Sequence, residues 1–339
     1  MKLPVGNVQS GKSAERMFSG SFLCVDDFFA NLLEIVSEVK RTMKISNGTI
    51  EVEASSHGAE LLSIRRNGKE YVWQGDPKYW GRHAPVLFPI VGKVWNDEYR
   101  VSGQTFHLTQ HGFARDMDFG SIPQDTGQKM AFVLKSDGHT RSLYPYDFQL
   151  KVEYELDADT LTKRDIVKNT GDIPMYYMIG NHPAFLYRDF DPADKIHGYV
   201  CFYNGRQLLK DFMLSPLTEH GALKHGKTIF TVPSGVLELK ADTFDDDALV
   251  FENSQIDMVV LLDKEQSPYL AVSFPTAQTL GIWSSKGKNA PFVCIEPWNG
   301  LTDPEGFEGD ITERAWIQCL EPGAEAVFEY AVTILDTLG

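Results

Sequence analysis

The alternation of apolar and polar residues is the strongest pattern in this chain. From about Ile45 onward, short segments in which every second residue is apolar are separated by turn residues, while long helical periodicity is nearly absent. Successive side chains of a β-strand point to opposite faces, so such a segment buries one face and exposes the other. The pattern predicts an all-β fold, with clear strands at 49–55, 148–156, 270–274 and 326–335.

Two tight hairpins are predicted early in this region. Asn67-Gly68 separates LLSIRR from KEYVW, and Ser102-Gly103 separates EYRV from QTFHL. Glycine readily reaches the positive φ that two-residue hairpin turns need. Many short strands without a βαβ pattern indicate two large antiparallel sheets packed face to face in a β-sandwich, with a cleft across one of them.

The first forty or so residues follow a different pattern. Residues 26–41 place large apolar side chains on one helical stripe, with Asp26 as a candidate N-cap. We therefore expect an N-terminal extension over 1–43 that carries an amphipathic helix, followed by one β-sandwich domain over 44–339. The helix either packs on the β domain or serves in docking, and its acidic polar face disfavours lipid headgroups.

Composition and charge narrow the class of protein. The chain has 339 residues, a formal net charge of -15 and a sequence pI near 5.0. An acidic surface repels polyanions, so nucleic acid and anionic membranes are not expected partners. No apolar run approaches the roughly 20 residues that span a bilayer, and the start of the chain lacks an uninterrupted hydrophobic signal core. We therefore expect a cytoplasmic protein.

The four cysteines give no sign of a metal or disulfide framework. Cys24, Cys201, Cys294 and Cys319 are widely scattered, and none of them stands in CxxC spacing. This distribution fits reduced, mostly buried thiols better than disulfides or a zinc site. We expect no cofactor and no metal.

Three segments combine a titratable residue with glycine, proline or aromatic neighbours. They are 110–116 (QHGFARD), 180–185 (GNHPAF) and 294–300 (CIEPWNG). Loops of this composition hold a side chain rigidly over a pocket, whereas a solvated face is richer in Lys, Glu and Ser. Each segment alone is weak evidence, because a single buried histidine is more often hydrogen-bonded within the core. Together they form the candidate site.

With three further motifs, these segments resemble the aldose 1-epimerase (galactose mutarotase-like) family, in particular its lactose-operon-associated branch. The further motifs are RHAPVLFPIVGK (82–93) with the hairpin after it, YPYDFQL (144–150) and FDDDALVF (244–251). The resemblance covers nearly everything from Lys44 to the C-terminus. It implies a large antiparallel β-sandwich, the galactose mutarotase-like supersandwich, whose concave sheet binds a free aldohexose and interconverts its α and β anomers without a cofactor.

The resemblance also implies roles for individual residues. Glu296 matches the family's general base, His182 its general acid, and His111 the assisting histidine near the ring oxygen. The candidate sugar ligands are Lys93, Asp247, Arg82, Asn181 and Trp298. At position 93 many relatives carry arginine, whose bidentate hydrogen bonds lysine cannot make. Trp283 is interpreted as a core residue.

Anomerisation explains why a base and an acid must face each other. Ring opening removes the proton of the anomeric hydroxyl while the ring oxygen is protonated, and reclosure on the other face runs the same steps in reverse. Glu296 and His182 supply this pair. The neighbours Pro297 and Trp298 are expected to desolvate the carboxylate, which raises its pKa.

Three alternatives stay open. Two histidines and a carboxylate also form a facial triad for iron, although such sites usually take one histidine and the carboxylate from neighbouring positions. A non-catalytic carbohydrate-binding protein needs aromatic and polar residues but no acid-base pair. A hexose-6-phosphate mutarotase needs basic residues at the pocket mouth, and only Arg82, Lys93 and Arg115 lie near the motifs. The expected partner is a small sugar, and the protein is a monomer or a homodimer.

Overall fold

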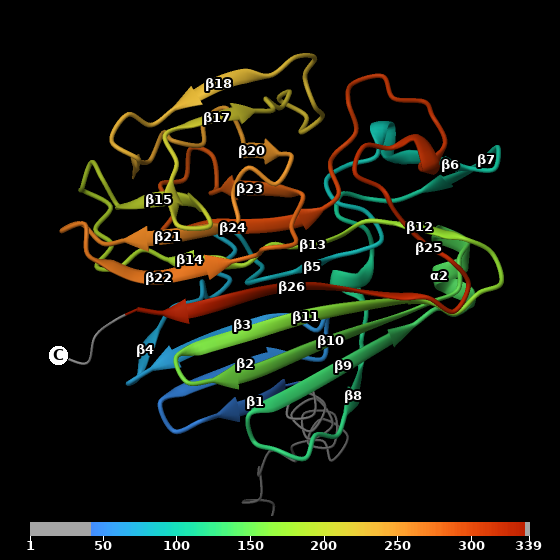
Figure 1. The fold of residues 1–339 in the computed structure, drawn as a ribbon, viewed down its shortest axis with the longest axis horizontal. Helices are drawn as coiled ribbons and strands as arrows, with labels where there is room; N and C mark the ends of the chain where they lie inside the picture. Colours follow the sequence, from blue (N-terminus) through green and yellow to red (C-terminus); the bar gives the residue numbers. More distant parts are fainter. Residues whose placement is uncertain (1–41, 336–339) are drawn as a thin grey trace, which may run out of the picture. The chain divides into compact units, whose positions relative to one another are not determined.

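The computed structural model describes residues 42–335 of the protein (Figure 1). Nearly all of its regular structure is β. The described residues contain one short α-helix, α2 (Gly138–Leu143), and the 3-10 turns η1 (Trp95–Asp97), η2 (Ala114–Asp116) and η3 (Ile311–Glu313). None of these helices has the length and apolar character to cross a membrane. The amphipathic helix predicted over 26–41 lies outside the described residues.

The first large sheet has ten strands. Its order is β16 (Gln207–Leu208), β15 (Gly198–Asn204), β21 (Met258–Leu262), β22 (Pro268–Ser273), β26 (Glu325–Ile334), β11 (Thr160–Asn169), β10 (Phe148–Asp157), β9 (Lys129–Lys135) and β8 (Gly120–Ile122), with β19 (Val236–Leu239) paired to β15. The long strands β10, β11 and β26 pair antiparallel. They form the continuous centre of this sheet.

The second large sheet has eight strands. Its order is β18 (Thr228–Thr231), β17 (Asp211–Leu214), β20 (Leu249–Glu252), β23 (Thr279–Trp283), β24 (Phe292–Asn299), β13 (Ile179–Asn181) and β5 (Val86–Leu87), with β14 (Ala184–Leu186) paired to β24. Smaller sheets join β1 (Thr42–Ser46), β2 (Ile50–Ser55), β3 (Leu61–Arg66) and β4 (Lys69–Glu70), β6 (Glu98–Val101) with β7 (Gln104–His107), and β12 (Met175–Tyr177) with β25 (Gln318–Leu320).

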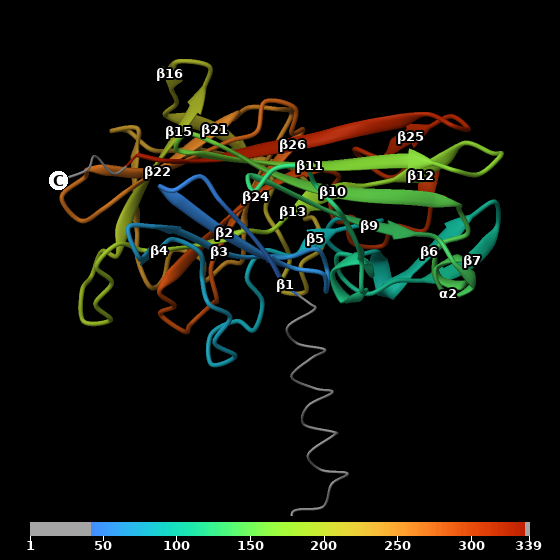
Figure 2. The ribbon, with the colours of Figure 1, turned by 90° about the horizontal axis from the view of Figure 1, so that it is seen from below.

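The two large sheets share one core. Figure 2 shows β26 and β11 in one layer, with β13 and β5 on the other side of the core. On β10, Leu150 and Val152 are buried while Lys151 between them is partly exposed. Val293 and Ile295 of β24 lie in the same hydrophobic cluster as these residues. The β-sandwich prediction is confirmed, and the four predicted strands correspond to β2, β10, β22 and β26.

Both predicted hairpins are also confirmed. β3 and β4 are joined by Asn67-Gly68, at φ 52° and 77°, and β6 and β7 by Ser102-Gly103, at φ 50° and 79°. Two consecutive residues with positive φ make the type of turn whose twist matches the flanking strands.

The backbone segment that carries His111 crosses the end of β5 at close range. The Phe88 N–H donates to the carbonyl of His111 at 3.2 Å, and the Phe113 N–H donates to the carbonyl of Phe88 at 3.1 Å. Gly112, between His111 and Phe113, has φ +70°, and a Cβ there would lie 2.3 Å from the Phe88 carbonyl oxygen. Only glycine lets the chain that carries His111 approach β5 this closely.

We therefore expect Gly112→Ala to destabilise the protein much more than Gly103→Ala. Both glycines have positive φ, which costs an alanine about 1–2 kcal/mol. At Gly103 a Cβ meets nothing within 4 Å, so the positive φ should be the only source of lost stability. At Gly112 the backbone clash adds about 1–3 kcal/mol of overpacking. Urea denaturation measures both losses, and equal losses would contradict the account of this crossing.

Candidate active site

A cavity of about 420 Å³ lies over the eight-stranded sheet. Its lining comes from segments far apart in the sequence and includes the predicted site residues Lys93, His111, His182, Asp247, Glu296 and Trp298. A second cavity of about 290 Å³ shares Lys93 and His220 with it. The volume of the larger cavity falls in the range typical of small-molecule sites.

Strand β24 presents Glu296 from the floor of the cavity. Because side chains alternate along a strand, Cys294, Glu296 and Trp298 lie on the face opposite the core residues Val293 and Ile295. Glu296 is only 2% exposed.

Two glycines leave room for the Trp298 ring on this floor. A Cβ on Gly180 of β13 would lie 2.6 Å from the indole, and a Cβ on Gly281 of β23 would lie 2.5 Å from it. The register pairs Gly180 with Trp298 and Gly281 with Glu296. The indole therefore lies flat over both flanking strands, which exposes part of its surface to the cavity.

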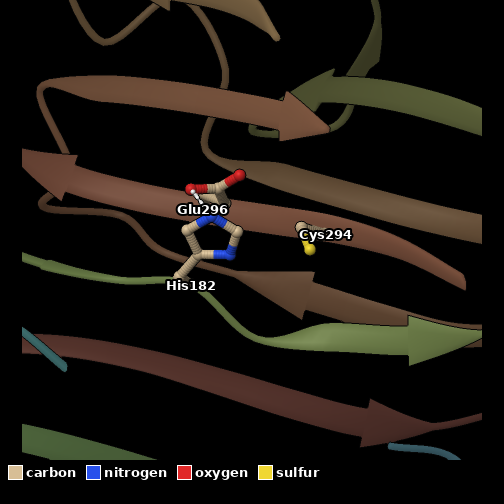
Figure 3. A group of neighbouring side chains, drawn as sticks. All are labelled: His182, Cys294 and Glu296. Carbon is tan, nitrogen blue, oxygen red and sulfur yellow. Dashed lines mark ion pairs between the residues drawn. The ribbon is translucent and has the colours of Figure 1, made fainter. Parts of the chain in front are cut away.

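His182 follows directly on β13 and meets Glu296. Its Nε2 lies 3.0 Å from Oε2 of Glu296, and the two side chains face each other in Figure 3. The imidazole stacks on Trp80 with ring centroids 4.8 Å apart. Its ring is nearly perpendicular to that of Trp283, with centroids 5.6 Å apart. The backbone N–H of His182 donates to the carbonyl of Pro85 at 3.1 Å. These contacts hold the ring in one orientation.

His111 is held in one tautomer by the backbone of Gly92. The Gly92 N–H donates to Nδ1 of His111 at 3.1 Å, and the His111 N–H donates back to the Gly92 carbonyl at 2.7 Å. Because Nδ1 accepts, a neutral His111 carries its proton on Nε2 and can donate it. Its ring lies edge-on to that of His182, with centroids 5.6 Å apart.

Burial favours the uncharged forms of all three groups. It raises the pKa of Glu296 well above its ordinary value, and the nearby charge of Asp247 raises it further. Burial lowers the pKa of His182 to about 3, with the guanidinium groups of Arg115 and Arg82 contributing. It also lowers the pKa of His111 well below its ordinary value, and His182 adds to this. Both shifts favour a neutral carboxyl group beside a neutral imidazole.

Lys93 and Asp247 line the cavity from two loops, one between β5 and η1 and one just before β20. Lys93 Nζ donates to the carbonyl of His220 at 2.9 Å, and its backbone N–H donates to Oγ1 of Thr302 at 3.0 Å. Asp247 has φ +77°, and its Oδ1 accepts the N–H of Ala248 at 2.8 Å. Of the three consecutive aspartates in its loop, Asp247 alone is part of the cavity lining.

Two of the expected sugar ligands do not line the cavity. Arg82 donates to Oδ1 of Asp116 at 2.8 Å, outside the lining. Asn181 is 1% exposed and hydrogen-bonds Lys163 and Asp165 inside the core. The physical reason is strand alternation: His182 faces the cavity, so its neighbour Asn181 faces the other way. The prediction of Asn181 as a direct ligand in this cavity is therefore wrong, whereas the role of Arg82 as a sugar ligand stays a prediction.

Other lining residues were missed or misread from the sequence. Trp283 was interpreted as core, but it lies two residues after Gly281 on the same face of β23 and lines the cavity. The spacing of two residues between Gly281 and Trp283 could have predicted that both lie on the same face of the strand. Trp80, Glu219 and Lys286 also line the cavity; they lie outside the strands, where no periodicity reports the direction of a side chain.

One group of side chains is close enough to hold a metal ion. Among residues 42–335, ligand atoms of His182, Cys294 and Glu296 lie within 4.8 Å of one another (Figure 3). This set differs from the two histidines and carboxylate considered for iron, because His111 is not part of it. All three side chains are buried.

Comparison with known proteins gives a consistent result. The family model described as Aldose 1-epimerase matches residues 41–312. The chromosomal and plasmid LacX proteins of Lactococcus lactis subsp. lactis are each 29% identical to this chain over 304 residues, covering 87% of it and 100% of the relative.

Solved structures agree with these matches. A galactose mutarotase related enzyme from Lactobacillus acidophilus is 34% identical, with a TM-score of 0.79 over 87% of this chain and 98% of that one. A galactose mutarotase-like protein from Lactobacillus casei ATCC 334 is 27% identical, with a TM-score of 0.78 over 86% of this chain and 99% of that one.

The raised pKa of Glu296 has a consequence for stability. Between the unfolded pKa and the folded pKa of this carboxyl group, the folded protein binds more protons than the unfolded chain, so its stability falls as pH rises. We expect Glu296→Gln, which cannot ionise, to raise the free energy of unfolding at pH 8 by about 1–3 kcal/mol.

Urea denaturation of both proteins at several pH values measures this difference. The gain should shrink as pH falls towards the ordinary pKa of glutamate, about 4.3. A Gln variant that is less stable than wild type at pH 8 would show that the carboxylate is stabilised by its surroundings.

Proposed function

The chain belongs to the aldose 1-epimerase family, and on this premise we propose that the cavity binds the ring of a free aldohexose and interconverts its α and β anomers. The observation that carries the proposal is the contact of 3.0 Å between His182 Nε2 and Glu296 Oε2, at the floor of a cavity of suitable size. Because burial favours the neutral forms of both groups, we assign one proton to the pair. An acid-base reaction at one carbon needs such a pair.

The proton count of the pair matches the reaction. Transfer of the shared proton from Glu296 to Nε2 of His182 produces a carboxylate and an imidazolium without any exchange with solvent. The carboxylate then removes the proton of the anomeric hydroxyl, and the imidazolium protonates the ring oxygen as the C1–O5 bond breaks. Rotation about C1–C2 and the reverse transfers close the ring as the other anomer. The raised pKa of Glu296 makes its carboxylate a stronger base than an exposed one.

The remaining lining residues are assigned to binding. His111 donates from Nε2 to a sugar oxygen, because Gly92 occupies its Nδ1. Lys93 donates to sugar hydroxyls and Asp247 accepts from them. The flat face of Trp298 packs against the C–H groups of the ring, as aromatic side chains present a large apolar surface. None of these assignments requires a cofactor.

The energetics of the pair favour catalysis over binding alone. A binding site gains nothing from burying a carboxyl group whose pKa is raised by desolvation, because keeping this group protonated above its ordinary pKa lowers stability. A catalytic site uses the same burial to bring basicity towards the working range. We therefore place the non-catalytic carbohydrate-binding alternative behind the epimerase.

A hexose-6-phosphate mutarotase is the second candidate. The observation in its favour is Lys286, which joins Lys93 and Arg115 in the cavity lining. Against it, the same lining carries the acids Glu219 and Asp247, so with Glu296 neutral the three cations are in excess by only one charge. A phosphate group carries close to two negative charges and needs an excess of cations. The free sugar therefore fits the lining better.

The first functional prediction concerns the acid-base pair. We expect Glu296→Gln to lower kcat at least about 100-fold, the lower end of the effect of a positioned general base, and His182→Asn to lower it comparably. The double variant should lose far less than the product of the two losses, because both groups act on one event. Polarimetry of a freshly dissolved anomer, corrected for spontaneous mutarotation, measures these rates.

Retained sugar binding is the control for this experiment, and isothermal calorimetry measures it. A correctly folded Gln variant that anomerises sugar at nearly the wild-type rate would make Glu296 a structural carboxylate and remove it from the mechanism.

The second functional prediction concerns the substrate. Because the cationic residues of the lining exceed the ionised acids by only one charge, we expect glucose or galactose to be anomerised with a higher kcat/KM than glucose 6-phosphate. Coupled or polarimetric assays across both classes decide between them. A higher kcat/KM for the phosphorylated sugar would overturn the assignment to free aldohexoses.

A further inference from the structure

A closed group of three polar side chains lies in the core beneath the cavity. Lys163 Nζ donates to a carboxylate oxygen of Asp165 and, at 2.7 Å, to Oδ1 of Asn181. The amide of Asn181 donates in turn to the other oxygen of Asp165 at 2.6 Å. Lys163 and Asp165 are fully buried and Asn181 is 1% exposed. We call these three residues the polar triangle.

The polar triangle joins the two large sheets. Lys163 and Asp165 stand on β11 of the ten-stranded sheet, among inward-facing residues that are otherwise apolar at Leu161 and Val167. Asn181 is the last residue of β13 in the eight-stranded sheet. The triangle therefore ties the end of β13 to a long central strand across the core.

Its place in the sequence connects it to the acid-base pair. Asn181 immediately precedes His182, and alternation sends the two side chains to opposite faces. Regular pairing of β13 with β24 reaches only Gly180, which pairs with Trp298. The next residue of β24 is Pro297, which has no N–H to donate. Backbone bonding to β24 resumes only at Pro183, whose carbonyl accepts the N–H of Ile295 at 3.1 Å. Between these two points Asn181 is paired only with Val86 of β5, and its side chain adds a bond across the core.

A contribution to folding stability does not by itself explain the polar triangle. Replacing a buried ion pair with apolar residues of similar volume is often neutral or stabilising, because removing two charges from water costs as much as their attraction returns. The contacts that the triangle makes are nevertheless specific, since each of the three polar groups hydrogen-bonds the other two. A satisfied buried network fixes one arrangement of the elements that carry it.

We propose that Lys163, Asp165 and Asn181 are positioning residues, which hold the backbone of His182 at the depth where its Nε2 meets Glu296. The prediction for kcat rests on the proposed function; the placement of the His182 ring does not. A shift of about 1 Å in a reacting group can lower a rate by about 100-fold. Losing the anchor should therefore reduce the rate of proton transfer while leaving the sugar ligands in place.

Asn181→Leu tests the proposal most simply, because it keeps the branching of the side chain, removes its hydrogen bonds and leaves Lys163 and Asp165 paired. We expect kcat to fall about 10- to 100-fold, with KM changed less than about threefold. The matched control is Asn169→Leu. Asn169 is also buried on β11, where it bonds the carbonyls of Ile173 and Leu320. This control should lower stability without changing kcat.

A second readout does not depend on activity. The ring nitrogen signals of His182 in NMR spectra, assigned with a His182→Asn variant, report its hydrogen bond to Glu296. We expect these signals to shift in Asn181→Leu and to stay unchanged in Asn169→Leu. If wild type does not accelerate anomerisation, the proposed function fails and the His182 signals alone decide whether the triangle positions the ring. Wild-type kcat and unshifted His182 signals in a folded Asn181→Leu would overturn the proposal.

An exchange of side chains gives the rescue test. The double variant Asn181→Asp, Asp165→Asn keeps one carboxylate, one amide and the lysine, so the same three hydrogen bonds can form. Each single variant either opposes two carboxylates or leaves Lys163 without its counter-charge. We expect the exchange variant to recover kcat within about threefold of wild type and to restore the His182 signals. An exchange variant that folds but has a kcat as low as that of Asn181→Leu would also overturn the proposal.

Discussion

The contact between His182 and Glu296 is the constraint around which the site is built. Two groups that would ionise in water lie 3.0 Å apart in surroundings that favour their neutral forms. Transfer of a proton from Glu296 to His182 becomes favourable only when a polar ligand contacts the carboxylate and the imidazolium that the transfer produces. A sugar that offers a proton on one oxygen and accepts one on a neighbouring oxygen meets this requirement. The chemistry is thus determined by burial as much as by residue type.

The sandwich supplies that burial by placing each partner on a different strand of one sheet. β24 presents Glu296 and the end of β13 presents His182. A glycine on β13 and another on β23 let the ring of Trp298 lie flat over both strands. Aromatic rings at Trp80 and Trp283 exclude water from one side of the imidazole. The same features lower the stability of the fold, because the carboxyl group is held where its charged form is poorly solvated. The burial that raises the basicity of Glu296 therefore also lowers the stability of the fold.

Sequence reasoning recovers the parts of this structure that local physics determines. Alternation locates the long strands, and Asn67-Gly68 and Ser102-Gly103 locate two hairpins, because turn geometry depends on a few adjacent residues. The three motif segments do meet in one cavity. The error at Asn181 was avoidable, since neighbours on a strand face opposite sides. Arg82 and Lys286 were not predictable in this way, because their placement depends on loops whose paths are set by distant contacts.

The most direct test of this account is the rate at which the wild-type protein interconverts the anomers of a free aldohexose. Saturation-transfer NMR measures exchange between the α and β signals of galactose or glucose at equilibrium, and the same sample without protein gives the spontaneous rate. The account predicts exchange that increases in proportion to protein concentration. Exchange that stays at the spontaneous rate for every free aldohexose, with folded protein present, would contradict it.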